Sequence, residues 1–281
     1  MKLIEPKAEL LEQKPGVEGM YEIIDRVAGI CYNREGVHDN PKEFVEGLIR
    51  KGHMRPLEFG TVCLKLKWWQ IIKFLKYLLN PYSKIRKLVN VTTNYRVIVE
   101  HNWFSDLKLM CEPTEHHLKR PCIVMACSRV TGDSFRTHIT LSSCMRSTRY
   151  CDYRNMEIVR PVWLEKRIPG ATTEYLYRLL EGTEDPETLQ MDVYWWWYTL
   201  QMCQDGYCNM VGLGRKRQEA RGVLPLDAGT RLCLCGFMDD NQNANEGWNR
   251  FFKMRIDGAA HDDAQILANQ IKELITKYLN K

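Results

Sequence analysis

Hydrophobic and polar positions alternate, or recur with helical spacing, along most of the chain. The alternation from Thr61 to Lys67 predicts a strand, and the β-rich runs at 122–127 and 230–237 predict two more. Apolar residues recur every three or four positions from Trp68 to Leu79 and from Ala264 to Leu279. That spacing gives each segment one apolar face, which is typical of an amphipathic helix.

Prolines and capping residues mark where other helices begin. Pro41 lies in a first turn after Asp39 or Asn40, which predicts a helix over 41–51. A short helix is also predicted around 84–90. Further helical signals lie at 25–30, at Thr92-Thr93 as a turn or helix start, on both sides of 182–187, and in the basic segment before Pro225. The chain has no internal repeat and no low-complexity linker, so one mixed α/β domain over 1–281 is expected.

Composition and charge leave the class of partner open. The chain has 281 residues, 44% of them hydrophobic and 27% charged, with a net charge of +5. A mildly basic protein of this kind suits an anionic small molecule as well as a nucleic acid. The basic run at 214–221 is the one argument for a nucleic acid, and a solvated helix face explains it equally well. No apolar signal segment begins the chain, and 68–79 is too short to span a bilayer, so a cytoplasmic protein is expected.

The eleven cysteines are scattered and form no CxxC pair. Reduced thiols in apolar surroundings are therefore expected, rather than a zinc ribbon or a thioredoxin-like site. His116 and His117 follow Glu115, but adjacent side chains diverge on any regular element, so no metal site is expected there. The aromatic run from Tyr194 to Tyr198 resembles a stacking platform, although such a run is more often core or interface.

Three places carry unusual chemistry. The segment Arg146 to Tyr150, "RSTRY", combines hydroxyls, backbone amides and a two-pronged guanidinium, which suits a phosphate. Arg221 stands at a helix end before a proline turn, and Arg255 follows an aromatic pair. Each feature alone also has an ordinary structural explanation: a solvated basic turn, a helix cap and a salt bridge.

Taken together and in order, the motifs resemble the flavin-dependent thymidylate synthases, and in particular longer members of the Bacteroidetes and phage type. The stretches that carry the resemblance are "GHMRPLEFGTVCLK", "TTNYRVIVEHNW", "EPTEHHLKRP", "STRYCDY", "EARGVLP", "GFMDD" with "WNRFFKMR", and "AHDDAQILA". The resemblance implies an α+β fold, a mixed α/β single domain with a central antiparallel-rich sheet flanked by helices. It also implies an insertion at about 68–120 relative to short members.

The resemblance further implies an activity. The family methylates dUMP to dTMP, with methylene-tetrahydrofolate as carbon donor, FAD as hydride carrier and NADPH as reductant. No cysteine nucleophile is needed. The implied assembly is a cytoplasmic homotetramer (in the host cytoplasm for a phage protein) whose active sites are shared between subunits, without nucleic-acid or membrane partners. An interface of that kind also accounts for surplus Trp and Tyr.

Residue roles follow by matching positions. The dUMP set is Ser147, Thr148 through its amide, Arg149, Arg221 and Arg255. Arg255 is the implied catalytic residue, because an arginine at the uracil edge can stabilise charge that develops on the ring. The implied FAD set is His53, Glu58, His138 on the motif helix, and His261. Tyr150 is expected to support the phosphate turn.

The chain departs from the family's pattern on the flavin side. The signature Arg-His-Arg, seven residues before Ser-x-Arg, reads Thr137-His138-Ile139 here. A polar pair is replaced by Cys144-Met145, and Glu-His by Glu58-Phe59. The segment "NQNANEG" is inserted before Trp248. Arg129, Arg136 and Arg146 are the nearby arginines that can take over the lost contacts.

Three hypotheses therefore remain open. The first is a flavin-dependent thymidylate synthase with an altered motif. The second is a divergent enzyme acting at C5 of dUMP or dCMP, with a variant in which Cys144 or Cys151 attacks C6 of the ring. The third is a non-catalytic nucleotide-binding paralogue that has lost normal FAD binding.

Overall fold

The computed structural model describes residues 1–67, 69–183, 190–238 and 246–280. The strands in this part of the chain are β1 (Lys2–Ile4), β2 (Lys7–Leu10), β3 (Thr61–Lys65), β4 (Lys84–Arg86), β5 (Asn90–Asn94), β6 (Cys122–Ser128), β7 (Ser142–Met145), β8 (Glu157–Val159) and β9 (Gly229–Cys235). They form a four-stranded sheet ordered β2-β6-β9-β7, a three-stranded sheet ordered β3-β5-β4, and the parallel pair β1-β8.

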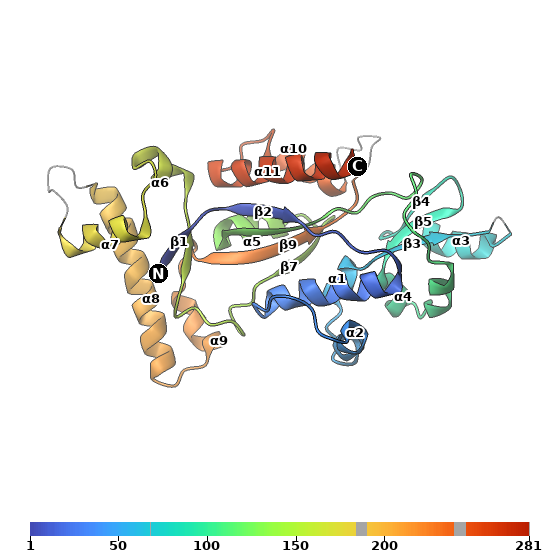
Figure 1. Cartoon of the computed structure of the whole chain (residues 1–281), viewed down its shortest axis with the longest axis horizontal. Coiled ribbons are helices and arrows are strands. Elements are labelled where there is room, and N and C mark those ends of the chain that lie inside the picture. The colour runs from blue at the N-terminus through green and yellow to red at the C-terminus, as the bar shows by residue number, and fades with distance from the viewer. Residues whose placement is uncertain (68, 184–189, 239–245, 281) are drawn as a thin grey trace.

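Helices surround these sheets (Figure 1). The α-helices are α1 (Gly16–Cys31), α2 (Pro41–Arg50), α3 (Ile71–Leu78), α4 (Tyr95–Glu100), α5 (Arg129–Arg136), α6 (Val162–Arg167), α7 (Thr173–Glu181), α8 (Met191–Gly212), α9 (Arg217–Ala220), α10 (Gly247–Arg255) and α11 (Asp262–Leu279). Short 3-10 turns lie at η1 (Arg55–Phe59), η2 (Phe104–Leu109) and η3 (Arg221–Val223). The expected α+β class is thus confirmed.

The four-stranded sheet is antiparallel throughout and separates two hydrophobic cores. Ile123 of β6 and Leu232 of β9 pack with α10 and α11 on one face. Cys122 and Cys233, one position away on the same strands, pack with α1 on the other. The two-residue period of a strand explains why each face is apolar, and Figure 1 shows the helices on either side.

The helix predicted around 84–90 is wrong, because this segment forms the hairpin β4–β5. Lys87 and Leu88 adopt positive φ angles of 49° and 61°, which turn the chain back. The β-branched Thr92 and Thr93 are buried in β5, where they pair with β3. Neither threonine starts a helix, since α4 begins three residues after Thr92 behind the Asn94 cap.

The sequence suggested that the motif segment is one helix, and the structure shows that it is not. Helix α5 ends at Arg136 with Thr137 as its C-cap, and the Thr137 hydroxyl donates to the Ser134 carbonyl at 2.7 Å. His138 lies in the turn that follows, and β7 begins at Ser142. A hydroxyl that bonds its own preceding turn competes with helix propagation, which accounts for the early end.

The other expectations vary in outcome. The helix predicted at 68–79 is α3 over Ile71–Leu78, and residue 68 lies outside the described residues. Within the aromatic run, Trp197 is fully buried in a core while Trp195 stays 55% exposed.

All eleven cysteines are free thiols, and seven are buried. Over the described ranges, no helix is long and apolar enough to cross a membrane, and no three metal-ligating side chains converge on one point.

Candidate nucleotide site

A cavity of about 640 Å³ opens between the end of α1, the η1 turn, β7 and the segment Ser147–Tyr150. Among the described residues its lining includes seven arginines: Arg55, Arg96, Arg129, Arg136, Arg146, Arg149 and Arg221. No aspartate or glutamate of the described chain lines it. So many guanidinium groups without a lining carboxylate make a strongly positive surface, which favours an anionic ligand.

Four of these arginines are free to meet such a ligand. Arg96, Arg136 and Arg146 are paired with Glu58, Asp133 and Glu157, respectively. Within the described ranges no carboxylate pairs with the side chains of the other four: Arg55, Arg129, Arg149 and Arg221. The Nη1 atom of Arg129 is buried without a hydrogen-bond partner in the described chain. A buried donor of this kind is costly to leave unsatisfied, and it belongs to a side chain that lines the cavity.

The turn after β7 presents hydrogen-bond donors to the same cavity. The Ser147 hydroxyl oxygen accepts the Arg149 amide at 3.2 Å, and the Ser147 amide donates to the Cys31 carbonyl at 3.0 Å. The hydroxyl hydrogen of Ser147 is thereby left to donate. The Thr148 amide has no acceptor among the described residues. The turn therefore offers neutral donors beside the free Arg149 guanidinium.

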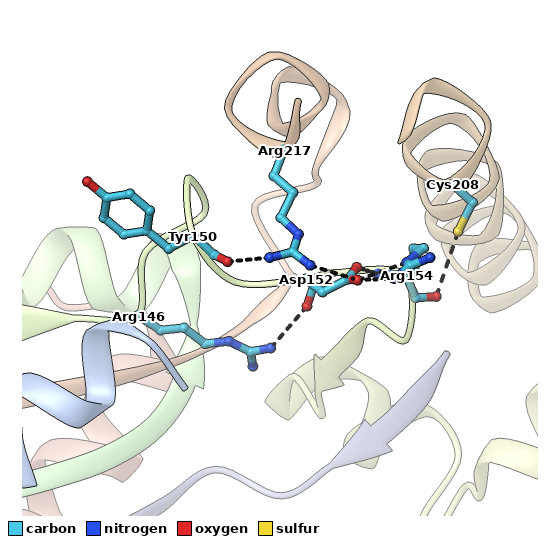
Figure 2. Close-up of polar contacts among 6 residues, drawn as sticks. All are labelled: Arg146, Tyr150, Asp152, Arg154, Cys208 and Arg217. Carbon is cyan, nitrogen blue, oxygen red and sulfur yellow. Dashed lines mark hydrogen bonds and ion pairs between the residues drawn. The ribbon is translucent and has the colours of Figure 1, made fainter. Parts of the chain in front are cut away.

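A network behind the turn holds it in place (Figure 2). Arg217 donates to the Tyr150 carbonyl at 2.7 Å and lies 3.4 Å from the Asp152 carboxylate. Asp152 also pairs with Arg154 at 2.5 Å, and its carbonyl accepts from Arg146 at 3.4 Å. Hydrogen bonds from Arg154 lower the pKa of Asp152, so this carboxylate stays charged. The network ties the turn to α9.

Two stacked tyrosines stand at the cavity. The rings of Tyr32, just after α1, and Tyr150 have centroids 5.3 Å apart and planes inclined by 28°. Both side chains line the cavity and are about half exposed. The Arg149 guanidinium lies 5.0 Å from the Tyr150 ring centroid. The cavity thus has an aromatic surface beside its cationic one, which suits a ligand with both a ring and a phosphate.

A pair of thiols lies in the same cavity wall. Cys31 at the end of α1 and Cys144 on β7 have sulfur atoms 3.0 Å apart. Burial and the contact with Cys31 raise the pKa of Cys144, and burial raises that of Cys151. The two cysteines that the sequence offered as nucleophiles are therefore buried thiols held in the protonated form.

Arg255 and His138 form a separate cluster. The Arg255 Nε donates to His138 Nε2 at 2.9 Å, and Nη2 donates to the Ser134 carbonyl at 2.7 Å. His138 is buried, and burial together with Arg255 and Arg250 lowers its pKa to about 4. Neither Arg255 nor His138 is among the described residues that line the cavity. Within the chain this arginine supports the end of α5.

The remaining predicted flavin residues do not gather in one place. His53 lines the cavity. The Glu58 carboxylate lies 2.6 Å from Arg96, outside the lining. His261 caps α11 and its side chain is 75% exposed. The structure therefore brings His53 together with Ser147, Thr148, Arg149 and Arg221, and places the rest elsewhere in the protomer.

Among the lining residues that sequence reasoning missed are Cys31, Tyr32, Arg55 and Arg96. Packing of α1, η1 and α4 brings them to the turn from far along the chain. Arg55 and Arg96 lie within stretches that carry the family resemblance, but the resemblance gave neither arginine a role. The three arginines named as substitutes for the lost motif pair, Arg129, Arg136 and Arg146, all line the cavity.

A second cavity of about 650 Å³ is less suited to binding an anion. Its lining mixes basic side chains with acidic ones, among them Glu5 and Glu165. Arg160 there already donates to Glu5 at 2.6 Å, to Glu165 at 3.3 Å and to the Ala171 carbonyl at 2.5 Å. Its charges are satisfied internally, in contrast to those around Ser147.

Comparisons with known proteins found two similar solved structures of one enzyme. A structure of PolB, a UMP/dUMP methylase from Streptomyces cacaoi bound with 5-Br UMP, is similar at 13% identity and a TM-score of 0.45, over 99% of this chain and 92% of that one. Its complex with 5-Br dUMP gives 11% identity and a TM-score of 0.43, over 99% and 93%. No curated protein matches the sequence.

A family model gives the decisive match. The model is described as "thymidylate synthase complementing protein", and it matches residues 115–279, more than half of the chain. The matched range contains the Ser147–Tyr150 turn, Arg221 and Arg255, while His53 and Glu58 precede it. The chain therefore belongs to the thymidylate synthase complementing protein family, Thy1.

Proposed function

We propose that the protein methylates C5 of dUMP to give dTMP, with methylene-tetrahydrofolate as carbon donor and FAD and NADPH as the reducing pair. Family membership supports the reaction class. One observation carries the assignment of the site: seven arginines and no lining carboxylate surround the Ser147–Tyr150 turn in the described chain. A nucleotide phosphate is the anion that such donors suit best.

In this proposal the turn holds the 5′-phosphate. Arg149 and Arg221 supply charge, and the Ser147 hydroxyl and Thr148 amide supply neutral donors. The guanidinium groups of Arg149 and Arg221 have no carboxylate partner in the described chain, so phosphate binding breaks no ion pair. The pyrimidine ring then lies toward the stacked pair Tyr32 and Tyr150, whose half-exposed side chains give the cavity an aromatic surface.

The role of Arg255 at the uracil edge requires a second subunit. In its own protomer, Arg255 donates to His138 and Ser134 and lies outside the cavity lining. We propose a homotetramer in which Arg255 of one subunit completes the cavity of another. Half-exposed side chains of α8, including Trp195 and Met202, supply apolar surface for such an assembly.

The donor chemistry of the cavity fits a second phosphate-bearing ligand such as FAD, although not through the motif. Thr137 is hydrogen-bonded to Ser134, and Ile139 is an apolar side chain that is 85% exposed. Arg129 and Arg136 line the cavity instead and, with His53, would hold a diphosphate there. When bound, FAD supplies the hydride that reduces the transferred carbon.

The same departures favour one rival function, a nucleotide-binding paralogue without flavin chemistry. Glu58, which the family resemblance assigns to the flavin, already lies 2.6 Å from Arg96. Such a protein would bind dUMP through Arg149 and Arg221 and catalyse no flavin-dependent turnover. A C5-modifying enzyme acting on dCMP would share the phosphate site and differ only at the ring.

Two measurements on the purified protein test the proposal. The first is the visible spectrum before and after FAD is added and excess is removed, followed by dUMP-dependent oxidation of the reduced flavin. The second is titration calorimetry with dUMP and dCMP. We expect retained flavin absorbance and tighter binding of dUMP. A colourless protein that still binds dUMP would point to the paralogue, and failure to bind either nucleotide would overturn the site assignment.

A further inference from the structure

One end of the molecule carries exposed apolar side chains that neither the nucleotide cavity nor the proposed assembly uses. Helix α3 and the hairpin β4–β5 lie at this end, and α8 lies at the other (Figure 1). The large exposed side chains here are Trp69, Leu75, Leu78, Leu79, Tyr82 and Leu88. Single exposed apolar residues are ordinary, but six within twenty positions of the chain indicate a surface that meets a partner.

The fold holds α3 with its leucines outward. Lys76 forms an ion pair with the fully buried Asp106, and the buried Tyr77 hydroxyl donates to the same carboxylate at 2.9 Å. The Lys76 Nζ also lies 4.2 Å from the centroid of the Trp103 ring. A polar contact therefore anchors the helix, while Leu75 and Leu78 stay exposed. A helix whose own protein is its only partner usually has the reverse arrangement, with its leucines packed on the core.

The tip of the hairpin belongs to the same surface. The Leu66 amide donates to the Val89 carbonyl at 2.8 Å, so the tip Lys87–Leu88 lies beside the segment that leads into α3. Helix α3 also packs against β4. The Lys67 Nζ lies 5.2 Å from the centroid of the Trp69 ring. Helix, connecting segment and hairpin tip thus present apolar and cationic side chains together, and we call them the α3 surface.

The charge of this region has one sign. Between Glu58 and Glu100 the chain carries eight lysines and arginines and no aspartate or glutamate. Three of the eight pair with carboxylates that lie outside this interval or at its ends. Within the described ranges Lys65, Lys67 and Lys87 have no carboxylate partner. Cations without partners, set among exposed apolar side chains, complement a partner that is anionic at its surface and apolar beneath it.

We propose that the α3 surface docks on an anionic phospholipid bilayer. Its leucines and Trp69 enter the boundary between headgroups and acyl chains, and its lysines lie at the lipid phosphates. Helix α3 has eight residues and is about 12 Å long, so it lies on the bilayer and does not cross it. The family model begins at residue 115, beyond this surface, and the family resemblance implies no membrane partner. The docking is therefore a property of this part of the chain.

Two other occupants fit the α3 surface less well. An amphipathic partner helix binds in a groove, and the six exposed apolar side chains line neither of the two cavities described above. A second copy bound through the same surface would bring its unpaired lysines toward those of the first, because a two-fold contact pairs each patch with itself. Like charges so placed repel each other. A bilayer is deformable and needs neither a groove nor a self-complementary charge pattern.

Co-sedimentation of the full chain with lipid vesicles tests the proposal. One set of vesicles is phosphatidylcholine alone, and the other is an equimolar mixture with phosphatidylglycerol. We expect binding to the anionic vesicles to be about a hundredfold tighter, from three cations at about fivefold each. Lys87→Gln should weaken this binding by about fivefold, whereas Lys2→Gln, at the other end of the molecule, should leave it unchanged.

A leucine variant tests the apolar part of the surface. Leu79→Gln combined with Leu88→Asn should weaken vesicle binding by about tenfold or more, because two apolar side chains no longer leave water. The φ angle of Leu88 is 61°, a conformation that asparagine adopts more readily than leucine, so the fold should be kept. Leu213→Gln is the matched control, since Leu213 is also an exposed leucine at the C-cap of a helix.

Vesicle binding that falls in the leucine variant and persists in Leu213→Gln supports the proposal. Equal binding by the two would mean that charge alone attracts the chain, and would overturn it, as would a wild type that does not bind anionic vesicles. Light scattering without lipid detects the second copy. A wild-type assembly that falls to a smaller mass in the leucine variant would make the surface a subunit interface instead. None of these outcomes bears on the proposed nucleotide site.

Discussion

The cavity around Ser147 and the cluster around Arg255 were expected to form one site, yet they differ in how their arginines are bonded. Arg149 and Arg221 have no carboxylate partner in the described chain and face an open cavity. Arg255 donates to His138 and to Ser134 within its own protomer. The difference teaches that a motif arginine identifies a ligand site only when its donors are left unsatisfied by the fold.

The contrast between the two regions also separates nucleotide binding, which one chain can carry out, from chemistry that needs contact between subunits. A cavity with unsatisfied donors can hold a phosphate within one protomer, whereas a satisfied arginine must lose its partners or act on another subunit. The bonding of each arginine therefore indicates whether its region controls nucleotide binding or turnover. Changes at the cavity should affect nucleotide affinity, and changes at Arg255 should affect turnover.

The largest effect is expected from Arg255→Ala, which should abolish dTMP formation while FAD binding persists. The shared-site proposal makes a sharper prediction for mixtures. Co-expression of Arg255→Ala with Arg149→Ala should restore part of the turnover, because one intact site can form from two different subunits. A mixture no more active than its parents would show that the two regions do not meet across an interface.

Arg149→Ala should weaken dUMP binding by about 10- to 100-fold, since a charge-assisted hydrogen bond is worth roughly 1.5–3 kcal/mol. Calorimetry with dUMP measures the loss. Arg215→Ala removes the same charge outside the cavity lining and is the matched control. Equal affinities for the two variants would mean that net charge, rather than the turn, attracts the nucleotide.

The sequence was most informative where a function depends on consecutive residues. The "RSTRY" segment pointed to a phosphate because its donors all come from one turn, and the structure places them at a cavity. The strand at 230–237 was predictable because its apolar and polar residues alternate, and the strand at 122–127 because it is a short apolar run rich in β-formers. The hairpin at 84–94 was not, because its turn uses Lys87 and Leu88 at positive φ, where glycine or asparagine is the usual signal.

The missed site residues have a common physical reason. Tyr32, Arg55 and Arg96 reach the cavity only because α1 and η1 pack against β7 and α4 packs against η1, and no spacing in the sequence encodes those contacts. The pairing of Cys31 with Cys144 spans 113 positions along the chain. Conversely, His138 was predicted beside the flavin from its place in a motif, and the motif does not show that Arg255 would donate to its Nε2.

A smaller effect is expected behind the turn. Arg217→Ala removes a hydrogen bond to the Tyr150 carbonyl and a contact with Asp152 without touching the cavity lining (Figure 2). The turn should become more mobile. The dUMP affinity should fall by only about two- to tenfold, less than for a charge-assisted bond to the nucleotide itself, because Arg217 acts through the turn. Arg217→Lys keeps the positive charge and should recover only part of the lost dUMP affinity. A loss as large as that of Arg149→Ala would place Arg217 in direct contact with the nucleotide.

The last effect is on stability rather than on binding or turnover, and it concerns how the stability of the Arg255 cluster depends on pH. Burial, Arg255 and Arg250 hold the pKa of His138 at about 4, against 6.5 for an ordinary histidine. The unfolded chain therefore binds a proton that the folded protein refuses, and stability falls as pH falls from about 6.5 to about 4. Above this window the histidine is neutral in both states and contributes no slope.

His138→Gln should remove that slope, because an amide oxygen can accept from the Arg255 Nε and does not titrate in this range. Urea unfolding of wild type and variant at about pH 7 and about pH 5 measures how the free energy of unfolding of each protein depends on pH. We expect wild type to lose about 1–2 kcal/mol more than the variant on acidification. Parallel losses would mean that His138 is protonated as readily in the folded protein as in the unfolded chain. In that case a neutral imidazole would not hold the Arg255 Nε, and the guanidinium would be held in the fold only through its Nη2 bonds to Ser134 and Thr137.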